Sequence, residues 1–173
     1  ASILISFNSI QIQPIKQTNS IEGSILERIA NHLPTEVTYL GVIIDHKLNF
    51  TRQIESCRTK AMNSFKAIYP LLCRRSMLST KNKLVLYKTI IRPRMTYASP
   101  VWINTAQTNH EKLKVTQNKI LKCIHGVPRT FPTNVLLEMS DVESITRLLY
   151  RQSDQFFNKC ASSEHELIRR ITN

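Results

Sequence analysis

Glycine is scarce in this chain of 173 residues. Its three glycines stand at positions 23, 41 and 126, which excludes a glycine-rich phosphate-binding loop. With seven prolines as well, the chain has little room for tight hairpins, so its composition favours helix. No apolar run reaches the roughly 18 to 20 residues of a bilayer-spanning helix, so no membrane partner is expected.

Paired cysteines and clustered carboxylates are also missing. The four cysteines include no C-x-x-C spacing, which argues against a zinc ribbon or knuckle. Cys57 and Cys123 fall on apolar stripes with helical spacing and are expected to act as small hydrophobes with free thiols. The aspartates, at positions 45, 141 and 154, form no D-D or D-x-D pair that could hold two metal ions. The sequence therefore assigns no catalytic residue and no metal ligand.

Acidic side chains are missing from the middle of the chain. Residues 46–129 carry 17 basic and two acidic side chains, whereas residues 1–45 carry two and four, and residues 130–173 five and six. No acidic residue occurs from Ser56 to His110. Such a block predicts a surface for a polyanion, because each phosphate contact releases counterions. The alternative is a solvated basic surface without a partner.

Strand-like patterns are confined to the N-terminal part. Residues 2–12 suggest a short strand or hairpin, residues 21–34 a short helix, and residues 38–44 a strand. Within that strand, Gly41 allows a bend or a close approach of backbone. The chain starts with neither methionine nor a signal peptide, so we expect the interior of a longer, non-secreted polypeptide.

Helical spacing begins at Thr51. A first helix, capped by Asn49 or Thr51, is predicted to end at Pro70. A second starts at the cap Ser79, and Pro93 stops or kinks it. On that helix Lys81, Lys88 and Arg92 share one stripe, beside an apolar face.

The segment YASPVW at 97–102 is expected to be a loop that buries Tyr97 and Trp102 against the bundle. A third helix covers about residues 111–124 and stops at Gly126. Gln117 faces inward on it, so we expect this side chain to tie the helix to a neighbouring backbone. His125 could ligate a metal with Cys123, but its place at a helix end favours an imidazolium there.

Two capping boxes, Ser140-x-x-Glu143 and Ser163-x-x-Glu166, predict the starts of a fourth and a fifth helix. The predicted fold is therefore mainly α, a helical bundle with a small N-terminal strand or hairpin element.

Three motifs in order carry a resemblance. YLGVIID at 39–45, IRPRMTYASPVW at 91–102 and TQNKILKCIHGVP at 116–128 resemble the region just after the catalytic palm of LINE-type (non-LTR) retrotransposon reverse transcriptases, especially jockey-like insect elements. The segment 71–93 is similar to the thumb of that family. The likeness covers about residues 37–171. At two places the chain departs from relatives: Gln53 replaces a common histidine, and Ala98 stands where a glycine often follows the tyrosine.

The resemblance implies roles and domains. Tyr39, Leu40 and Gly41 would belong to the primer grip, where glycine lets backbone approach nucleic acid; a need of sheet packing alone remains the alternative. The thumb would grip duplex backbone through five cations: Arg74, Arg75, Lys81, Lys88 and Arg92. The expected divisions are the palm end with the primer-grip strand (1–48), a basic thumb-like bundle (49–129) and C-terminal helices (130–173).

The resemblance also limits the function expected of this chain. The family's Tyr/Phe-x-Asp-Asp catalytic motif is absent, so Mg²⁺ is implied for the parent polymerase and no cofactor for this chain. Expected partners are RNA, DNA and their hybrid duplex, and the remainder of the polymerase. Expected locations are a nuclear or a cytoplasmic ribonucleoprotein. The alternative is an inactive, truncated or co-opted helical module that acts through protein contacts.

Overall fold

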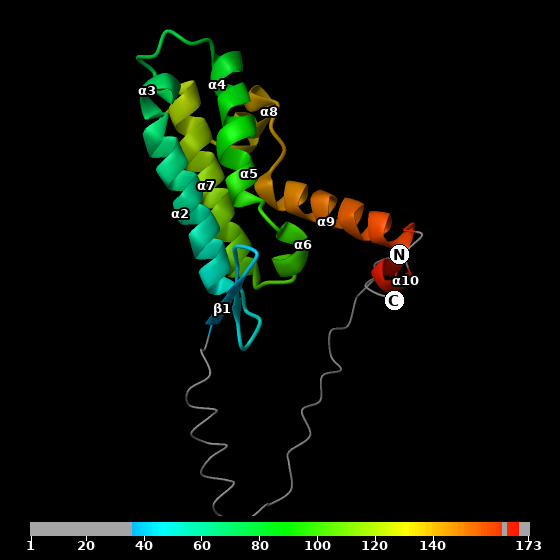
Figure 1. Ribbon diagram of the computed structural model, residues 1–173. Helices are drawn as coiled ribbons and strands as arrows, with labels where there is room; N and C mark the ends of the chain where they lie inside the picture. The colour runs from blue at the N-terminus through cyan, green and yellow to red at the C-terminus, as the bar shows by residue number, and fades with distance from the viewer. Residues whose placement is uncertain (1–35, 164–165, 170–173) are drawn as a thin grey trace, which may run out of the picture.

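The computed structural model describes residues 36–163 and 166–169 and confirms a mainly helical bundle with a small β element (Figure 1). The expected strand at 2–12 and helix at 21–34 lie outside the described residues. The chain begins with β1 (Glu36–Tyr39) and β2 (Val42–Asp45), which pair antiparallel with Tyr39 opposite Val42. The strand expected across 38–44 is therefore wrong: it is a hairpin, because its centre turns at Leu40 and Gly41.

Two long helices and one composite helix form the bundle. They are α2 (Thr51–Ala67), α7 (Gln107–His125), and a run made of α4 (Thr80–Leu86), the π-helical turn η1 (Tyr87–Ile91) and α5 (Arg92–Met95). Short helices α3 (Tyr69–Leu72) and α6 (Ser99–Trp102) connect them. After the bundle come α8 (Thr133–Ser140), α9 (Ile145–Ala161) and α10 (Glu166–Arg169). In Figure 1, α9 runs away from the three long helices.

Several predicted helix ends are confirmed and several are wrong. The Ser79 side chain accepts the Asn82 amide and caps α4, and Gly126 ends α7 with φ 66°. Neither Asn49 nor Thr51 caps α2: its N-cap is Phe50, in the left-handed region at φ 54°. Pro70 lies in the first turn of α3, after α2 has ended at Ala67.

Pro93 does not stop its helix. The Arg92 amide bonds to the Tyr87 carbonyl oxygen, five residues back, and the helical path continues to Met95. A proline ring would clash with the carbonyl four residues earlier in a regular α-helix, and a widened π turn relieves that conflict.

The Ser140 capping box is also wrong. Ser140 is the last residue of α8, a helix that the sequence reading missed, and its hydroxyl donates to the Leu136 carbonyl. Asp141 closes α8 in the left-handed conformation, which aspartate tolerates better than most residues. Helix α9 starts only at Ile145.

The buried core is continuous through the described helices. Tyr87, Trp102, Leu113, Ile120 and Leu149 are among the side chains with no exposed surface in one cluster. This cluster includes residues before and after position 130. The division into 1–48, 49–129 and 130–173 stays a prediction.

Candidate nucleic-acid interface

The hairpin tip is a two-residue turn made by Leu40 and Gly41. Their φ angles, 47° and 77°, are both positive, as a type I′ turn requires. A Cβ atom on Gly41 would lie 3.6 Å from Tyr97 Oη, which is an ordinary contact. The backbone angle, more than the available space, therefore explains this glycine. The approach of nucleic acid to Gly41 stays a prediction.

Tyr97 holds the hairpin to the bundle. Its hydroxyl donates to the Leu40 carbonyl at 2.7 Å, and 49% of its surface is exposed. The expectation that Tyr97 is buried was wrong, because its ring reaches out to the turn. Trp102 is fully buried, as expected, and its indole nitrogen donates to the Tyr97 carbonyl. The YASPVW segment is partly helical, since α6 begins at Ser99.

Asp45 and Gln53 make further polar contacts between the hairpin and the start of α2. The Asp45 carboxylate accepts the amides of Asn49 and Phe50, at 2.8 and 2.9 Å, and so satisfies amides at the start of α2. Gln53, fully buried, accepts the Ile43 amide at 2.9 Å. The tip itself stays open, with Tyr39 65% and Leu40 74% exposed. The hairpin therefore presents an aromatic and an aliphatic side chain from a fixed base.

Three of the predicted cations lie at the other end of the bundle, in residues 73–81, which join α3 to α4 and include the first two residues of α4. We call this segment the basic loop. Arg74, Arg75 and Lys81 are exposed, and none has an ion pair or hydrogen bond to the described residues. Lys83 is almost fully buried and donates to the Cys73 carbonyl at 2.8 Å. A buried ammonium thus anchors the loop, because leaving it without a partner would be costly.

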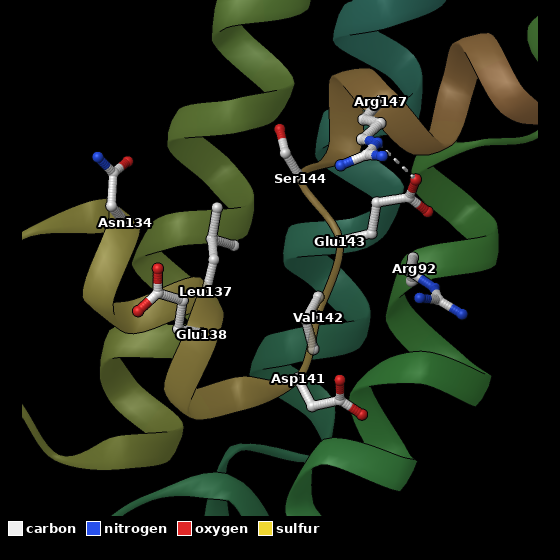
Figure 2. A pocket seen from close by; sticks show the side chains of 9 residues that line it. All are labelled: Arg92, Asn134, Leu137, Glu138, Asp141, Val142, Glu143, Ser144 and Arg147. Atoms are coloured by element: carbon white, nitrogen blue, oxygen red, sulfur yellow. Dashed lines mark ion pairs between the residues drawn. The ribbon is translucent and has the colours of Figure 1, made fainter.

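Lys88 and Arg92 are placed differently. Lys88 Nζ donates to the Asp141 carbonyl at 3.0 Å. Arg92 lines a shallow, open groove of about 690 Å³ together with Asp141 and Glu143 (Figure 2). Glu143 pairs there with Arg147, as the dashed line shows. These two cations lie among oxygen acceptors and carboxylates, so they are weaker candidates for phosphate contacts than Arg74, Arg75 and Lys81.

The hairpin and the basic loop are separated by the length of α2. This helix runs from the hairpin to α3, next to the basic loop (Figure 1). Its 17 residues correspond to about 25 Å. Apart from Lys88 and Arg92, the residues predicted for the site therefore lie in two groups, one at each end of α2.

Within the described residues, no group of three or more His, Cys, Asp and Glu side chains could hold a metal ion. The four cysteines are free, and burial raises the pKa of the Cys57 thiol. His125 was expected to favour its charged form at the helix end, but partial burial lowers its pKa. Its Nε2 donates to Ser140 Oγ at 2.8 Å, because the serine proton is engaged by Leu136. None of the described helices has both the length and the apolarity that a bilayer crossing requires.

Sequence reasoning missed the structural roles of Lys83 and Asp45. Lys83 lies one turn before Tyr87 on the inward face, so its helical position carried a usable signal. The Asp45 contacts had no usable signal, since they lie at a stretch of backbone with two left-handed residues, Leu48 and Phe50, that the sequence does not indicate.

The comparison with known proteins shows a clear relationship. The RNA-directed DNA polymerase from mobile element jockey of Drosophila funebris is 32% identical over 152 residues, 88% of this chain and 16% of that protein. The probable RNA-directed DNA polymerase from transposon X-element of Drosophila melanogaster is 32% identical over 101 residues, 58% of this chain and 11% of that protein. The chain is homologous to jockey-type RNA-directed DNA polymerases. These relatives are encoded by non-LTR retrotransposons.

The homology covers most of this chain but only a small part of each polymerase. A third relative, the probable RNA-directed DNA polymerase from transposon BS, is 21% identical over 92% of this chain and 17% of that protein. The chain therefore spans less than a fifth of the length of the jockey-type polymerases it matches. No protein-family profile matches the chain. No solved structure matches it either.

Proposed function

We propose that this chain is the primer-grip and thumb portion of a jockey-type reverse transcriptase, and that it binds the template–primer duplex. The observation that carries the proposal is a group of exposed cations, close together in the chain, that have no counter-charge. In the part of the chain that the structure describes, Arg74, Arg75 and Lys81 have no polar partner, and they lie together from the α3–α4 connection to the first turn of α4. Neighbouring cations without counter-charges favour binding to a phosphate backbone. Such phosphate contacts position a duplex without reading its sequence.

The hairpin supplies the second contact point. Tyr39, Leu40 and Gly41 form a tip held by Tyr97 and by Gln53. Such a fixed tip can steady the end of a primer strand. The resemblance implies Mg²⁺ for bond formation in the parent polymerase. The family's Tyr/Phe-x-Asp-Asp motif does not occur in this sequence, so the proposal assigns duplex binding and no catalytic step to these residues.

The test compares two triple variants of the chain that remove equal charge. Arg74, Arg75 and Lys81 changed to Gln should lower affinity for an RNA–DNA hybrid steeply. The slope of log K against log salt should fall by roughly 2 to 3. Arg52, Arg58 and Lys114 changed to Gln serve as the matched control, because each already pairs with a glutamate. Equal losses in both variants would count against the basic loop as the binding surface.

The alternative, a helical module that acts through protein contacts, is favoured by exposed apolar side chains at the hairpin end. Val37, Tyr39, Leu40, Leu48 and Val101 are each more than half exposed. They could equally receive the remainder of a polymerase. Wild-type chain that binds acidic protein more tightly than hybrid, with no dependence on the basic loop, would support the alternative.

A further inference from the structure

The basic loop has a rigid frame, although it is a surface connection. The Cys73 carbonyl accepts both the Ser76 amide at 3.1 Å and the buried Lys83 ammonium at 2.8 Å. Ser76 Oγ accepts the Leu78 amide at 3.1 Å, which forms a tight turn centred on Met77. The aliphatic part of Arg74 packs against Gly126, where a Cβ atom would lie 3.2 Å from Arg74 Cδ.

At the tip of this loop lies Met77, an apolar side chain that is fully exposed to solvent. Met77 is 101% exposed, more than any other large hydrophobic side chain in the described ranges. Loop tips in water usually carry polar residues, and here the turn directs a methionine outward. A fixed, exposed methionine suits insertion into a partner, because its flexible thioether fills irregular gaps.

The surroundings of Met77 identify the chemistry of that partner. Arg74, Arg75 and Lys81 flank it, and none has a polar partner among the described residues. No acidic residue occurs within twenty positions of Met77 in the sequence. The partner must therefore be negative at its rim and offer an apolar crevice between its charges. A nucleic-acid duplex has this arrangement, with phosphates beside stacked bases that side-chain wedges can part.

We propose that Met77 is a wedge that enters the minor groove of the bound duplex, while Arg74, Arg75 and Lys81 contact the flanking phosphates. The minor groove of an A-form-like hybrid is wide and shallow, which makes it accessible to a short loop. The inference rests on the proposed duplex binding and deepens it, since it assigns an apolar contact to the loop. Phosphate contacts alone would give no reason for the methionine.

The test uses the full chain and a hybrid duplex with 2-aminopurine at successive positions. Met77→Ser should weaken binding roughly tenfold, the size expected for one buried apolar side chain. It should also abolish the fluorescence rise that marks an unstacked base. Met77→Leu should bind within about twofold of wild type, since it keeps apolar volume. The salt slope should stay unchanged in both variants, because no charge is removed.

Met139→Ser is the matched control, because Met139 is exposed on α8 outside the basic loop. Wild-type affinity retained by Met77→Ser would overturn the wedge and leave duplex binding standing. Equal losses in the two methionine variants would overturn it as well, as would tighter, Met77-dependent binding to phosphatidylserine vesicles. Wild-type chain without salt-sensitive binding to the hybrid would overturn the proposed function together with the wedge.

Discussion

At the scale of single residues, left-handed backbone without glycine is the most informative feature. Leu40, Leu48, Phe50, Ala98 and Asp141 all have positive φ. Four of them belong to the hairpin region or to the segment that carries Tyr97. For residues with a Cβ this conformation costs on the order of 1 kcal/mol each. Leu40 lies at the exposed tip, whereas Leu48 and Phe50 lie in the connection from β2 to α2.

Ala98 allows a direct measurement of that strain. It has φ 54° and is the N-cap of α6. Ala98→Gly should raise the free energy of unfolding by about 0.5 to 1 kcal/mol, because glycine adopts this conformation without steric cost. Urea denaturation would measure the change.

The control is Ala106→Gly, which also changes an N-cap alanine but at φ −56°. It should leave stability unchanged or slightly lower, since glycine only adds freedom to the unfolded chain there. A loss of stability in Ala98→Gly as large as in the control would show that the left-handed conformation stores no strain.

At the scale of elements, Gln117 fixes the start of α9. It is fully buried, its Nε2 donates to the Glu143 carbonyl at 2.9 Å, and its Oε1 accepts the Ile145 amide at 2.7 Å. The prediction that this side chain ties α7 to a neighbouring backbone is confirmed. One of the free amides at the helix start is thus satisfied from another helix. Ser144, the N-cap residue, makes no side-chain cap of its own.

Gln117→Leu should lower the free energy of unfolding by about 2 to 4 kcal/mol, because it leaves two buried backbone groups without partners. Hydrogen exchange at the Ile145 amide should accelerate more than exchange within α2. Gln155→Leu, an exposed substitution on α9, is the control and should change stability little. Similar stability of the two variants would mean that the Gln117 bonds contribute nothing net.

Helix ends that depend on neighbouring residues could be predicted from the sequence. Helix ends that depend on contacts with distant residues could not. The Ser79 cap and the Gly126 stop depend on residues within one turn, and both were found. The capping box at Ser140 failed because its hydroxyl bonds within α8 and because Gln117 serves the start of α9. The hairpin was read as one strand because Leu40 gives no signal for positive φ.

The stripe of cations shows the same limit. Helical spacing predicts that Lys81, Lys88 and Arg92 share one face. Whether each side chain is free to contact a phosphate depends on the residues that pack beside it. Lys88 donates to the Asp141 carbonyl in the α8–α9 connection, and Arg92 lines the groove beside Asp141 and Glu143. Sequence alone identified the basic region, and only the fold could show that Lys88 is engaged and that Arg92 lies beside carboxylates.

At the scale of the whole molecule, the separation of the two proposed contact points sets a length for the proposed duplex. The hairpin and the basic loop lie at opposite ends of α2, about 25 Å apart along its axis. At the B-form rise of about 3.4 Å per base pair this corresponds to about 7 base pairs, and to somewhat more in an A-form-like hybrid, whose rise is shorter. A duplex that reaches both points should bind through both, which raises its effective affinity.

Affinity for blunt RNA–DNA hybrids should therefore rise steeply up to about 8 base pairs and then level off. Leu40→Asn should flatten this length dependence, because it removes the apolar tip while asparagine tolerates the positive φ of the turn. The basic-loop triple variant should instead weaken binding at every length. Fluorescence anisotropy on hybrids of about 5 to 16 base pairs would measure both effects. Affinity that grows only in proportion to the number of phosphates, with no break near 8 base pairs and no effect of Leu40→Asn, would show that the two points do not act on one duplex.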